Sequence, residues 1–290
     1  MPEPRYRGRF APSPTGPLHF GSLVTALASY VEARVHRGQW LVRIEDLDPL
    51  REPPEATGQI LQALEAHALA PDEPVRFQSR RPSAYQAAID DLLARGHAYR
   101  CPCSRKELQA HGGRHPHACR TRPPSPLQRP FAVRFKLHDE DCHWQDQLLG
   151  PQRHPVRAEL DDPVILRKEG FYAYQLAVVV DDIDQGITDV VRGSDLLDMT
   201  AQQQQIYRAL GARPPRWLHI PVIRNEQGQK LSKQTHAPAL DNSRASANLV
   251  DALRALGQNP PNGLAQARPE QILAWACSHW RRQAIDLTAR

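Results

Sequence analysis

The residues most suited to chemistry in the N-terminal part lie in one short segment, RFAPSPTGPLHFG at positions 9–21. It holds an arginine, two hydroxyl side chains, a histidine and four residues that exclude a regular helix or strand: Pro12, Pro14, Gly16 and Pro17. The residues before it (5–10) are typical of a strand, and the apolar pattern after it predicts a helix ending at Gly38. In an open α/β sheet, this order brings a helix N-terminus to the edge where phosphates bind. A simple chain reversal is the alternative.

A second group of reactive side chains consists of cysteines, three of which lie within nineteen residues, with His115 four residues before the last of them. Three thiolates and an imidazole complete a tetrahedral zinc shell and leave no position for a catalytic water. We therefore predict one structural Zn²⁺ ion, bound by Cys101, Cys103, His115 and Cys119. Unliganded surface cysteines are the alternative, since C-x-C is less specific than paired C-x-x-C motifs. Four other residues compete as ligands: His111, His117, Cys142 and His143.

Carboxylates form a third group, directly after a predicted buried strand over residues 39–45. The strand delivers Glu45, Asp46 and Asp48 to one edge of a sheet. Acids in such a turn are most often only solvated.

The remaining pattern predicts the elements that position these residues. Before the cysteines we expect a helix with Ile60, Leu61 and Leu64 inward, a strand over 75–77 and a helix over 82–95. After them we expect a Pro-rich connector (120–130), a strand (131–137) and a surface hairpin or loop (138–150). Next come a hairpin that pairs 164–166 with 171–174 and a buried apolar segment (177–180) that ends in Asp181 and Asp182.

The C-terminal third is predicted to be mainly helical. A helix over 199–211 is expected to turn its glutamine run, Gln202–Gln205, toward solvent, and a strand follows over 216–223. Helices over 245–256 and 269–282 are expected to pack together or on the core, with Arg281 and Arg282 solvated or touching RNA.

Composition limits the class of protein. The chain has 290 residues, net charge +5 and a pI of about 9.1, which suits a polyanionic partner without proving one. No apolar run reaches the ~20 residues of a membrane span, and the N-terminus lacks the apolar region of a signal peptide. The odd number of cysteines favours metal binding in a reducing compartment. We expect a soluble, cytoplasmic protein with no membrane partner.

Two motifs resemble signatures of a known enzyme family. P-x-P-T-G-x-L-H-F-G (12–21), with Ser22 at the last position, resembles the HIGH motif of class I aminoacyl-tRNA synthetases in its glutamyl and glutaminyl branch. KLSK (230–233) resembles their KMSK motif, and RIEDLDPLR (43–51) is similar to RIEDTDPER of glutamyl-tRNA synthetases. Two motifs in the family's order are far more specific than either alone.

The resemblance implies ATP-dependent activation of L-glutamate, with Mg²⁺ accompanying ATP. His19 and Lys233 would be catalytic. ATP-binding positions would be Pro12, Thr15, Gly16, His19, Gly21, Lys230, Ser232 and Lys233. Glutamate would be bound by Arg9, Ser13, Glu45, Tyr174 and Arg192.

The length of the chain refines the resemblance. About 57 residues follow Lys233, which leaves no room for the anticodon-binding domain of a glutamyl-tRNA synthetase. This length and the cysteine spacing resemble the shortened paralogues that transfer glutamate to queuosine in the anticodon loop of tRNA(Asp). The resemblance thus implies queuosine-containing tRNA(Asp) as partner, and we expect a monomer. His115 stands where such relatives carry Tyr.

The expected fold is α/β: a class I synthetase Rossmann-like parallel sheet with a zinc-bearing insertion and a small helical C-terminal region. Its expected parts are 1–99 and 162–235, the halves of the nucleotide-binding domain, the insertion 100–161, and the C-terminal region 236–290. Three alternative functions stay open: a minimal glutamyl-tRNA synthetase, an enzyme that loads glutamate on a non-tRNA carrier, and a non-catalytic RNA-binding paralogue.

Overall fold

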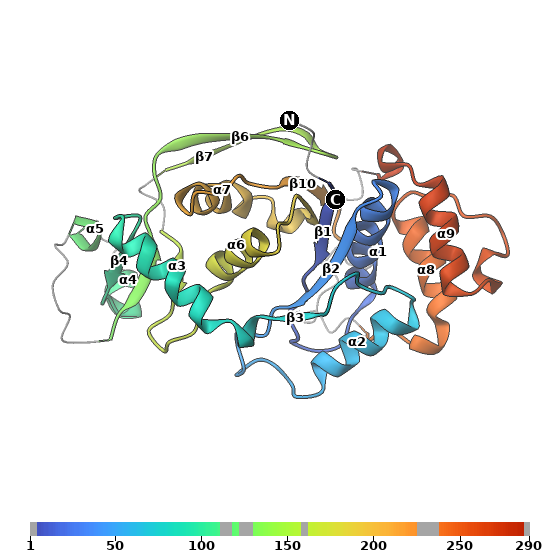
Figure 1. Ribbon diagram of the computed structural model, residues 1–290, viewed down its shortest axis with the longest axis horizontal. Coiled ribbons are helices and arrows are strands. Elements are labelled where there is room, and N and C mark those ends of the chain that lie inside the picture. Colours follow the sequence, from blue (N-terminus) through green and yellow to red (C-terminus); the bar gives the residue numbers. More distant parts are fainter. Residues whose placement is uncertain (1–4, 111–117, 122–129, 158–161, 225–237, 287–290) are drawn as a thin grey trace.

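The computed structural model describes residues 5–110, 118–121, 130–157, 162–224 and 238–286. It is an α/β protein in which parallel strands run through the middle and helices cover both sides (Figure 1). The strands are β1 (Arg7–Phe10), β2 (Gln39–Ile44), β3 (Arg76–Phe77), β4 (Ala98–Cys101), β5 (Ala132–Phe135), β6 (Glu140–Asp146), β7 (Gly150–Val156), β8 (Val164–Leu166), β9 (Asp189–Gly193) and β10 (Arg216–Ile220). The helices are α1 (Phe20–Val35), α2 (Ala56–Ala66), α3 (Pro82–Ala94), α4 (Arg105–Ala110), α5 (Ala118–Thr121), α6 (Tyr174–Asp184), α7 (Met199–Ala209), α8 (Ala245–Ala255) and α9 (Pro269–His279).

The central strands form two parallel halves that meet between β1 and β9. β1 pairs with β2 and β2 with β3, while β9 pairs with β10 and β10 with β6, all in parallel. The backbone of Thr188 joins the halves, since its N–H donates to the carbonyl of Arg7 (2.9 Å) and its carbonyl accepts from Arg216 (2.8 Å). The strand order thus reverses between β1 and β9, and ligands of open α/β sheets bind at such a point. The predicted parallel α/β fold is confirmed.

Alternation along the strands gives the sheet two distinct faces. In β2, Trp40, Val42 and Ile44 belong to the apolar cluster around α1, whereas Leu41 belongs to the cluster around α6 and α7. Because side chains alternate with period two, Arg43 lies on the α6 face.

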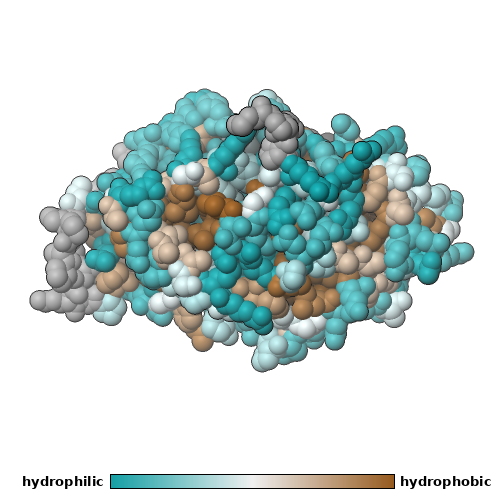
Figure 2. All heavy atoms as spheres, viewed as in Figure 1, coloured by the Kyte–Doolittle hydropathy of each residue, from teal (hydrophilic) through white to brown (hydrophobic). Residues whose placement is uncertain are grey.

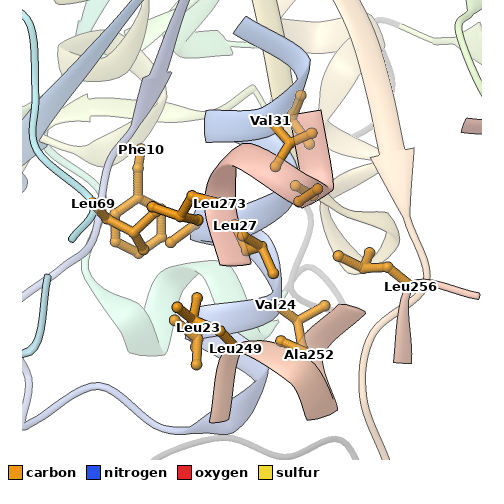
Figure 3. Packing of buried hydrophobic residues seen from close by; sticks show 14 of the residues in the cluster. Phe10, Leu23, Val24, Leu27, Val31, Leu69, Leu249, Ala252, Leu256 and Leu273 are labelled. Atoms are coloured by element: carbon orange, nitrogen blue, oxygen red, sulfur yellow. The ribbon is translucent and has the colours of Figure 1, made fainter. Parts of the chain in front are cut away.

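Helix α1 is buried on most of its circumference. Its Leu23, Val24, Leu27 and Val31 lie among residues of β1, α8 and α9 (Figure 3). It ends at Val35, three residues before the predicted end. Gly38 then passes so close to Tyr6 that a Cβ atom would lie 2.3 Å from the Tyr6 carbonyl oxygen, which explains the glycine there.

Three strands that follow α3 form a small antiparallel sheet, in the order β4–β5–β8, with α4 and α5 beside it at the left of Figure 1. The predicted hairpin after residue 138 is confirmed as β6 and β7. It is more than a surface feature, because β6 also joins the main sheet beside β10. The predicted pairing of 164–166 with 171–174 shrinks to one bridge, Leu166 with Tyr172, since Tyr174 already begins α6. The apolar segment 177–180 lies inside that helix.

The prediction for the glutamine run was wrong. Gln203, Gln204 and Gln205 of α7 are buried rather than solvated. Gln205 accepts a hydrogen bond from His138 N–H (2.9 Å), and Gln203 accepts one from Arg192 (2.7 Å). Gln203 and Gln205 are buried because each has a polar partner on a neighbouring element.

Helices α8 and α9 pack on each other and on α1, as predicted (Figure 1). Arg282 is neither solvated nor free for RNA, because its Nε donates to the buried Glu32 of α1 at 2.9 Å. Trp280 Nε1 donates to the same carboxylate at 2.7 Å. A carboxylate inside α1 therefore fastens the C-terminal segment to the core.

Most of the face seen in Figure 2 is covered by polar residues, and apolar residues show mainly near its centre. Among the described residues, no helix is both long and apolar enough to cross a membrane.

Removing the guanidinium that faces Glu32 should destabilise the protein. We expect Arg282→Met to lower the free energy of unfolding by about 2 to 3 kcal/mol, because the buried carboxylate of Glu32 loses its cation. The loss is smaller than for a fully buried pair, since Arg282 is partly exposed to water. Urea unfolding measures this loss. The control is Arg254→Met, whose pair with Asp251 is exposed and should be worth at most about 1 kcal/mol. Equal effects of the two substitutions would contradict the assignment.

Candidate active site

A cleft of about 590 Å³ opens where the strand order reverses. Its walls come from the ends of β1, β2 and β9, the first turn of α1 and the start of α6. The cleft brings together nine residues that the sequence singled out: Arg9, Pro12, Ser13, Thr15, His19, Gly21, Glu45, Tyr174 and Arg192. Gly16 is buried in the same loop with φ +150°, a backbone angle that favours glycine. Lys230, Ser232 and Lys233 lie outside the described residues.

His19 caps the N-terminus of α1. Its Nδ1 accepts a hydrogen bond from the backbone N–H of Ser22 at 3.3 Å, so the proton of the neutral ring is on Nε2. Gly21 and Ser22 of the first helical turn also line the cleft. A helix N-terminus and an imidazole N–H donor thus meet there, which is a favourable environment for an anion.

Arg9 is held in place by Asp182 of α6. Its Nε and Nη2 donate to the two carboxylate oxygens of Asp182 at 3.1 to 3.3 Å, and both side chains are buried. Although burial acts to lower it, the Asp182 carboxylate raises the Arg9 pKa. Within the described residues, Arg9 Nη1 makes no hydrogen bond to protein, and Arg9 lines the cleft. One edge of the guanidinium is therefore anchored while its other edge remains available.

Glu45 lies at the end of β2, beside Arg43. Arg43 is fully buried and contacts Asp182 at 2.8 Å and Glu45 at 3.4 Å. Burial raises the pKa of Glu45 to about 7, against the opposing effect of Arg43 and Arg9. Glu45 therefore presents to the cleft a carboxylate that a cationic ligand would stabilise in its ionised form.

Arg192 of β9 is a buried guanidinium whose hydrogen-bond partners are all neutral. Its four hydrogen bonds go to His219, Gln203, Thr200 and the carbonyl of Leu196. Among the described residues, no carboxylate lies within ion-pair distance of it, and burial lowers its pKa. An uncompensated buried cation is costly, so an anionic ligand at this place would be strongly stabilised.

A second hollow of about 500 Å³ adjoins the cleft and shares four of its lining residues: Ser13, Thr15, Glu45 and Tyr174. Tyr174 is half-buried, and its partial removal from water raises its pKa and keeps it a neutral hydroxyl. Asp48, Glu52 and Arg167 line the far side of the hollow. The cleft thus has room beside it for a second substrate.

The zinc prediction is supported in part. The sulfur atoms of Cys101, Cys103 and Cys119 lie within 4.8 Å of one another, as a shared metal requires. The fourth proposed ligand, His115, lies outside the described residues, as do the competitors His111 and His117. The structure excludes Cys142 from this cluster, because it is buried under α7 and its thiol contacts the carbonyl of Ala201.

Sequence inspection missed the residues behind the cleft, namely Arg43, Asp146, Asp182, Gln203 and His219. A signal was present in two cases, since a lone arginine in QWLVRIE and a lone histidine in RWLHIPVI interrupt strands that are otherwise apolar. Such residues are buried only when they have partners.

The raised pKa of Glu45 predicts a pH-dependent stability. In the unfolded chain the carboxyl titrates near 4.5 and in the folded chain near 7, so folding binds a proton between these values. The quantity to compare is the free energy of unfolding of the wild type minus that of Glu45→Gln. We expect this difference to fall by up to about 3 kcal/mol from pH 4.5 to pH 7 and to stay constant at higher pH. Urea unfolding at several pH values measures it, with exposed Glu65→Gln as control. If the difference between wild type and Glu45→Gln stays constant or rises over this range, the raised pKa of Glu45 is wrong.

Comparisons with known proteins agree with this geometry. Residues 5–257 match the family described as tRNA synthetases class I (E and Q), catalytic domain. Curated relatives named glutamyl-Q tRNA(Asp) synthetase include one from Vibrio cholerae, 45% identical over 98% of this chain and 95% of its own length. Another, from Pseudomonas aeruginosa, is 48% identical over 98% of this chain and 96% of its own.

Among solved structures, a glutamate tRNA ligase from Elizabethkingia meningosepticum, in complex with its amino acid, is 25% identical with a TM-score of 0.79. The likeness covers 97% of this chain and 66% of that one, so about a third of the ligase has no counterpart here. The match of sequence, fold and cleft leads to one conclusion: this chain belongs to the class I tRNA synthetases of the E and Q type, and it is a ligase.

Proposed function

We propose that this protein activates L-glutamate with ATP and transfers the glutamate to the queuosine base in the anticodon loop of tRNA(Asp). The observation that carries the first half is the charge pattern of the cleft. Two buried guanidinium groups, Arg9 and Arg192, and one buried carboxyl, Glu45, face the same space. Glutamate carries the complementary set of two carboxylates and one ammonium.

Each charge of the amino acid then has a partner. Arg9 and Tyr174, with Ser13 beside them, bind the γ-carboxylate, Arg192 binds the α-carboxylate, and Glu45 accepts from the ammonium. An arginine paired with a carboxylate is worth about 1.5 to 3 kcal/mol, more than a neutral hydrogen bond. Glutamine would turn either its amide N–H₂, which is itself a donor, or its neutral amide oxygen toward the N–H groups of Arg9. Both arrangements pair the guanidinium less well than a carboxylate does. The pocket therefore selects glutamate.

ATP occupies the part of the cleft beside α1. His19 donates from Nε2 to a phosphate, the loop carrying Pro12, Thr15 and Gly16 lies along the nucleotide, and Gly21 gives it room. Lys230, Ser232 and Lys233 of the KLSK motif are assigned to the phosphates by resemblance. Mg²⁺, which accompanies ATP, would neutralise phosphate charge.

Activation joins the two substrates. An oxygen of the α-carboxylate attacks the α-phosphorus, the bond to the β-phosphate bridging oxygen breaks, and pyrophosphate leaves with that electron pair. The products are glutamyl-adenylate and pyrophosphate. His19 and Lys233 would stabilise the charge that develops on the phosphates, a type of interaction worth about 3 to 4 kcal/mol per donor.

The acceptor is proposed from the names of the relatives and from the room beside the cleft. Both curated relatives are named for tRNA(Asp), and this chain matches nearly the whole length of each. The adjoining hollow shares Glu45 and Tyr174 with the cleft, so an acceptor entering it would reach the activated carboxyl.

We also propose that Cys101, Cys103, Cys119 and His115 bind one structural Zn²⁺ ion. The close sulfur atoms of three cysteines support it, and thiolates are the ligands zinc prefers. The ion would hold β4 and α5 together at the tip of the insertion. It would take no part in the reaction, because four protein ligands fill its shell.

Substitution of one cysteine tests the zinc site. We expect Cys103→Ser to reduce bound zinc from about one ion per chain to near zero, since two thiolates and an imidazole bind zinc far less tightly. Metal analysis of the purified protein measures this. Cys277→Ser is the matched control, because Cys277 lies on α9 and outside the cluster, and it should keep its zinc. Zinc retained by Cys103→Ser, or absent from the unmodified protein, would refute the site.

Transfer of labelled glutamate tests the function. With ATP and Mg²⁺, we expect label on queuosine-containing tRNA(Asp), and none on tRNA(Asp) without queuosine or on tRNA(Glu). Arg192→Lys should lower the rate at limiting glutamate about ten- to hundredfold, because lysine lacks the planar fork. Arg254→Lys on the exposed face of α8 should have no effect.

The other outcomes decide among the alternatives. Label on tRNA(Glu) would favour a minimal glutamyl-tRNA synthetase. Pyrophosphate exchange without label on any tRNA would point to a carrier as acceptor. No exchange and no label would favour a non-catalytic RNA-binding protein.

A further inference from the structure

A chain of three buried side chains runs from the β6–β7 hairpin to the cleft. Asp146 at the end of β6, His219 of β10 and Arg192 of β9 follow one another at hydrogen-bond distance. The Asp146 carboxylate accepts from His219 Nδ1 at 2.6 Å, and His219 Nε2 accepts from Arg192 Nε at 3.0 Å. His219 is completely buried, and Asp146 and Arg192 are at most 4% exposed.

The proton positions in this chain follow from chemistry. An ionised carboxylate only accepts hydrogen bonds, and a guanidinium only donates them. His219 must therefore carry its proton on Nδ1 and offer the bare Nε2 to Arg192. The imidazole is neutral, in agreement with burial lowering its pKa below the ordinary value.

Asp146 is itself fixed by the backbone. Its Oδ1 accepts from the N–H groups of Leu148 and Leu149 at 3.0 and 2.9 Å, and from His219 N–H at 3.3 Å. Burial acts to raise the pKa of Asp146, but the hydrogen bonds from His219 and this backbone lower it overall. The carboxylate thus stays charged and orients the imidazole.

We propose that His219 is a positioning residue for Arg192: its neutral ring, held in one tautomer by Asp146, aims the guanidinium into the cleft. This inference rests on the proposed function, in which Arg192 binds the α-carboxylate of glutamate. Thr200 and Gln203 hold the other nitrogens of Arg192, so His219 is the partner that fixes the Nε edge. A carboxylate at the position of His219 would neutralise the positive charge with which Arg192 binds the substrate. The neutral imidazole accepts the hydrogen bond from Arg192 Nε without neutralising that charge.

Three substitutions separate positioning from simple packing. Glutamine keeps an acceptor near the position of Nε2, asparagine keeps a polar group only near Nδ1, and leucine keeps neither. In glutamate-dependent pyrophosphate exchange, we expect His219→Asn and His219→Leu to raise the KM for glutamate about ten- to hundredfold. The KM for ATP should change less than about threefold, and His219→Gln should stay near the wild-type value for both. The control His143→Leu, exposed on β6, should change nothing.

Opposite results would overturn the inference. An unchanged KM for glutamate in His219→Leu, equal effects of Gln and Asn, or parallel rises in both KM values would show a purely structural residue. Melting temperatures of all variants are measured beside the kinetics, so loss of folding is seen directly.

A second measurement needs no substrate. In ¹⁵N spectra of the imidazole at neutral pH, we expect a protonated Nδ1 and a bare Nε2 for His219, and loss of this single tautomer in Asp146→Asn. A protonated Nε2 would refute the inference even if the enzyme is active. Absence of glutamate-dependent exchange by the unmodified protein would instead refute the proposed function, and the spectra would still decide the role of His219.

Discussion

The structure depends on a network of opposite charges buried between the sheet and α6. Asp182 accepts from Arg9 and Arg43 and from the hydroxyl of Tyr207, while its neighbour Asp181 accepts from Gln78, Arg81 and Tyr85. Isolated, any one of these charges would be too costly to bury. Together they fix the carboxyl ends of β1 and β2 against one helix. The same contacts set the direction of Arg9 and the environment of Glu45, so packing and substrate recognition share one set of interactions.

The two-residue period of the strands explains why this network faces the cleft. Arg9, Arg43, Arg192 and His219 each stand next in sequence to an apolar residue of the α1 cluster: Phe10, Val42, Val191 and Leu218. The four polar side chains therefore lie on the opposite face, toward α6 and α7. Since parallel strands end at one edge, the charged groups converge where the strand order reverses. Asp181, Asp182 and Glu45 lie within ion-pair distance of Arg9, Arg43 or Arg81, and none of the three lies within that distance of Arg192. The fold thus creates a place for an anion.

The sequence predicted the groups that would touch a ligand better than the groups that hold them. The loop of residues 9–21, Glu45, Tyr174 and Arg192 were identified from motifs, and the structure brings these together at one cleft. Asp182 was noted only as the end of an apolar segment, because nothing local shows that α6 packs on β1. Hydropathy alone assigned Gln203–Gln205 to solvent. It carries no information on tertiary partners, such as His138 and Arg192, that make burial of an amide favourable. The hairpin of β6 and β7 was predicted, but its pairing with β10, which supplies Asp146, requires the tertiary structure.

The most direct test of this account is ATP–pyrophosphate exchange without any tRNA, with glutamate, glutamine and aspartate compared at equal concentrations. If the charges of the cleft recognise both carboxylates and the ammonium at their proper spacing, glutamate supports exchange. Aspartate, one methylene shorter, and glutamine, without the second carboxylate, then support little or none. Exchange with glutamine as rapid as with glutamate, or no exchange with glutamate, would contradict the account.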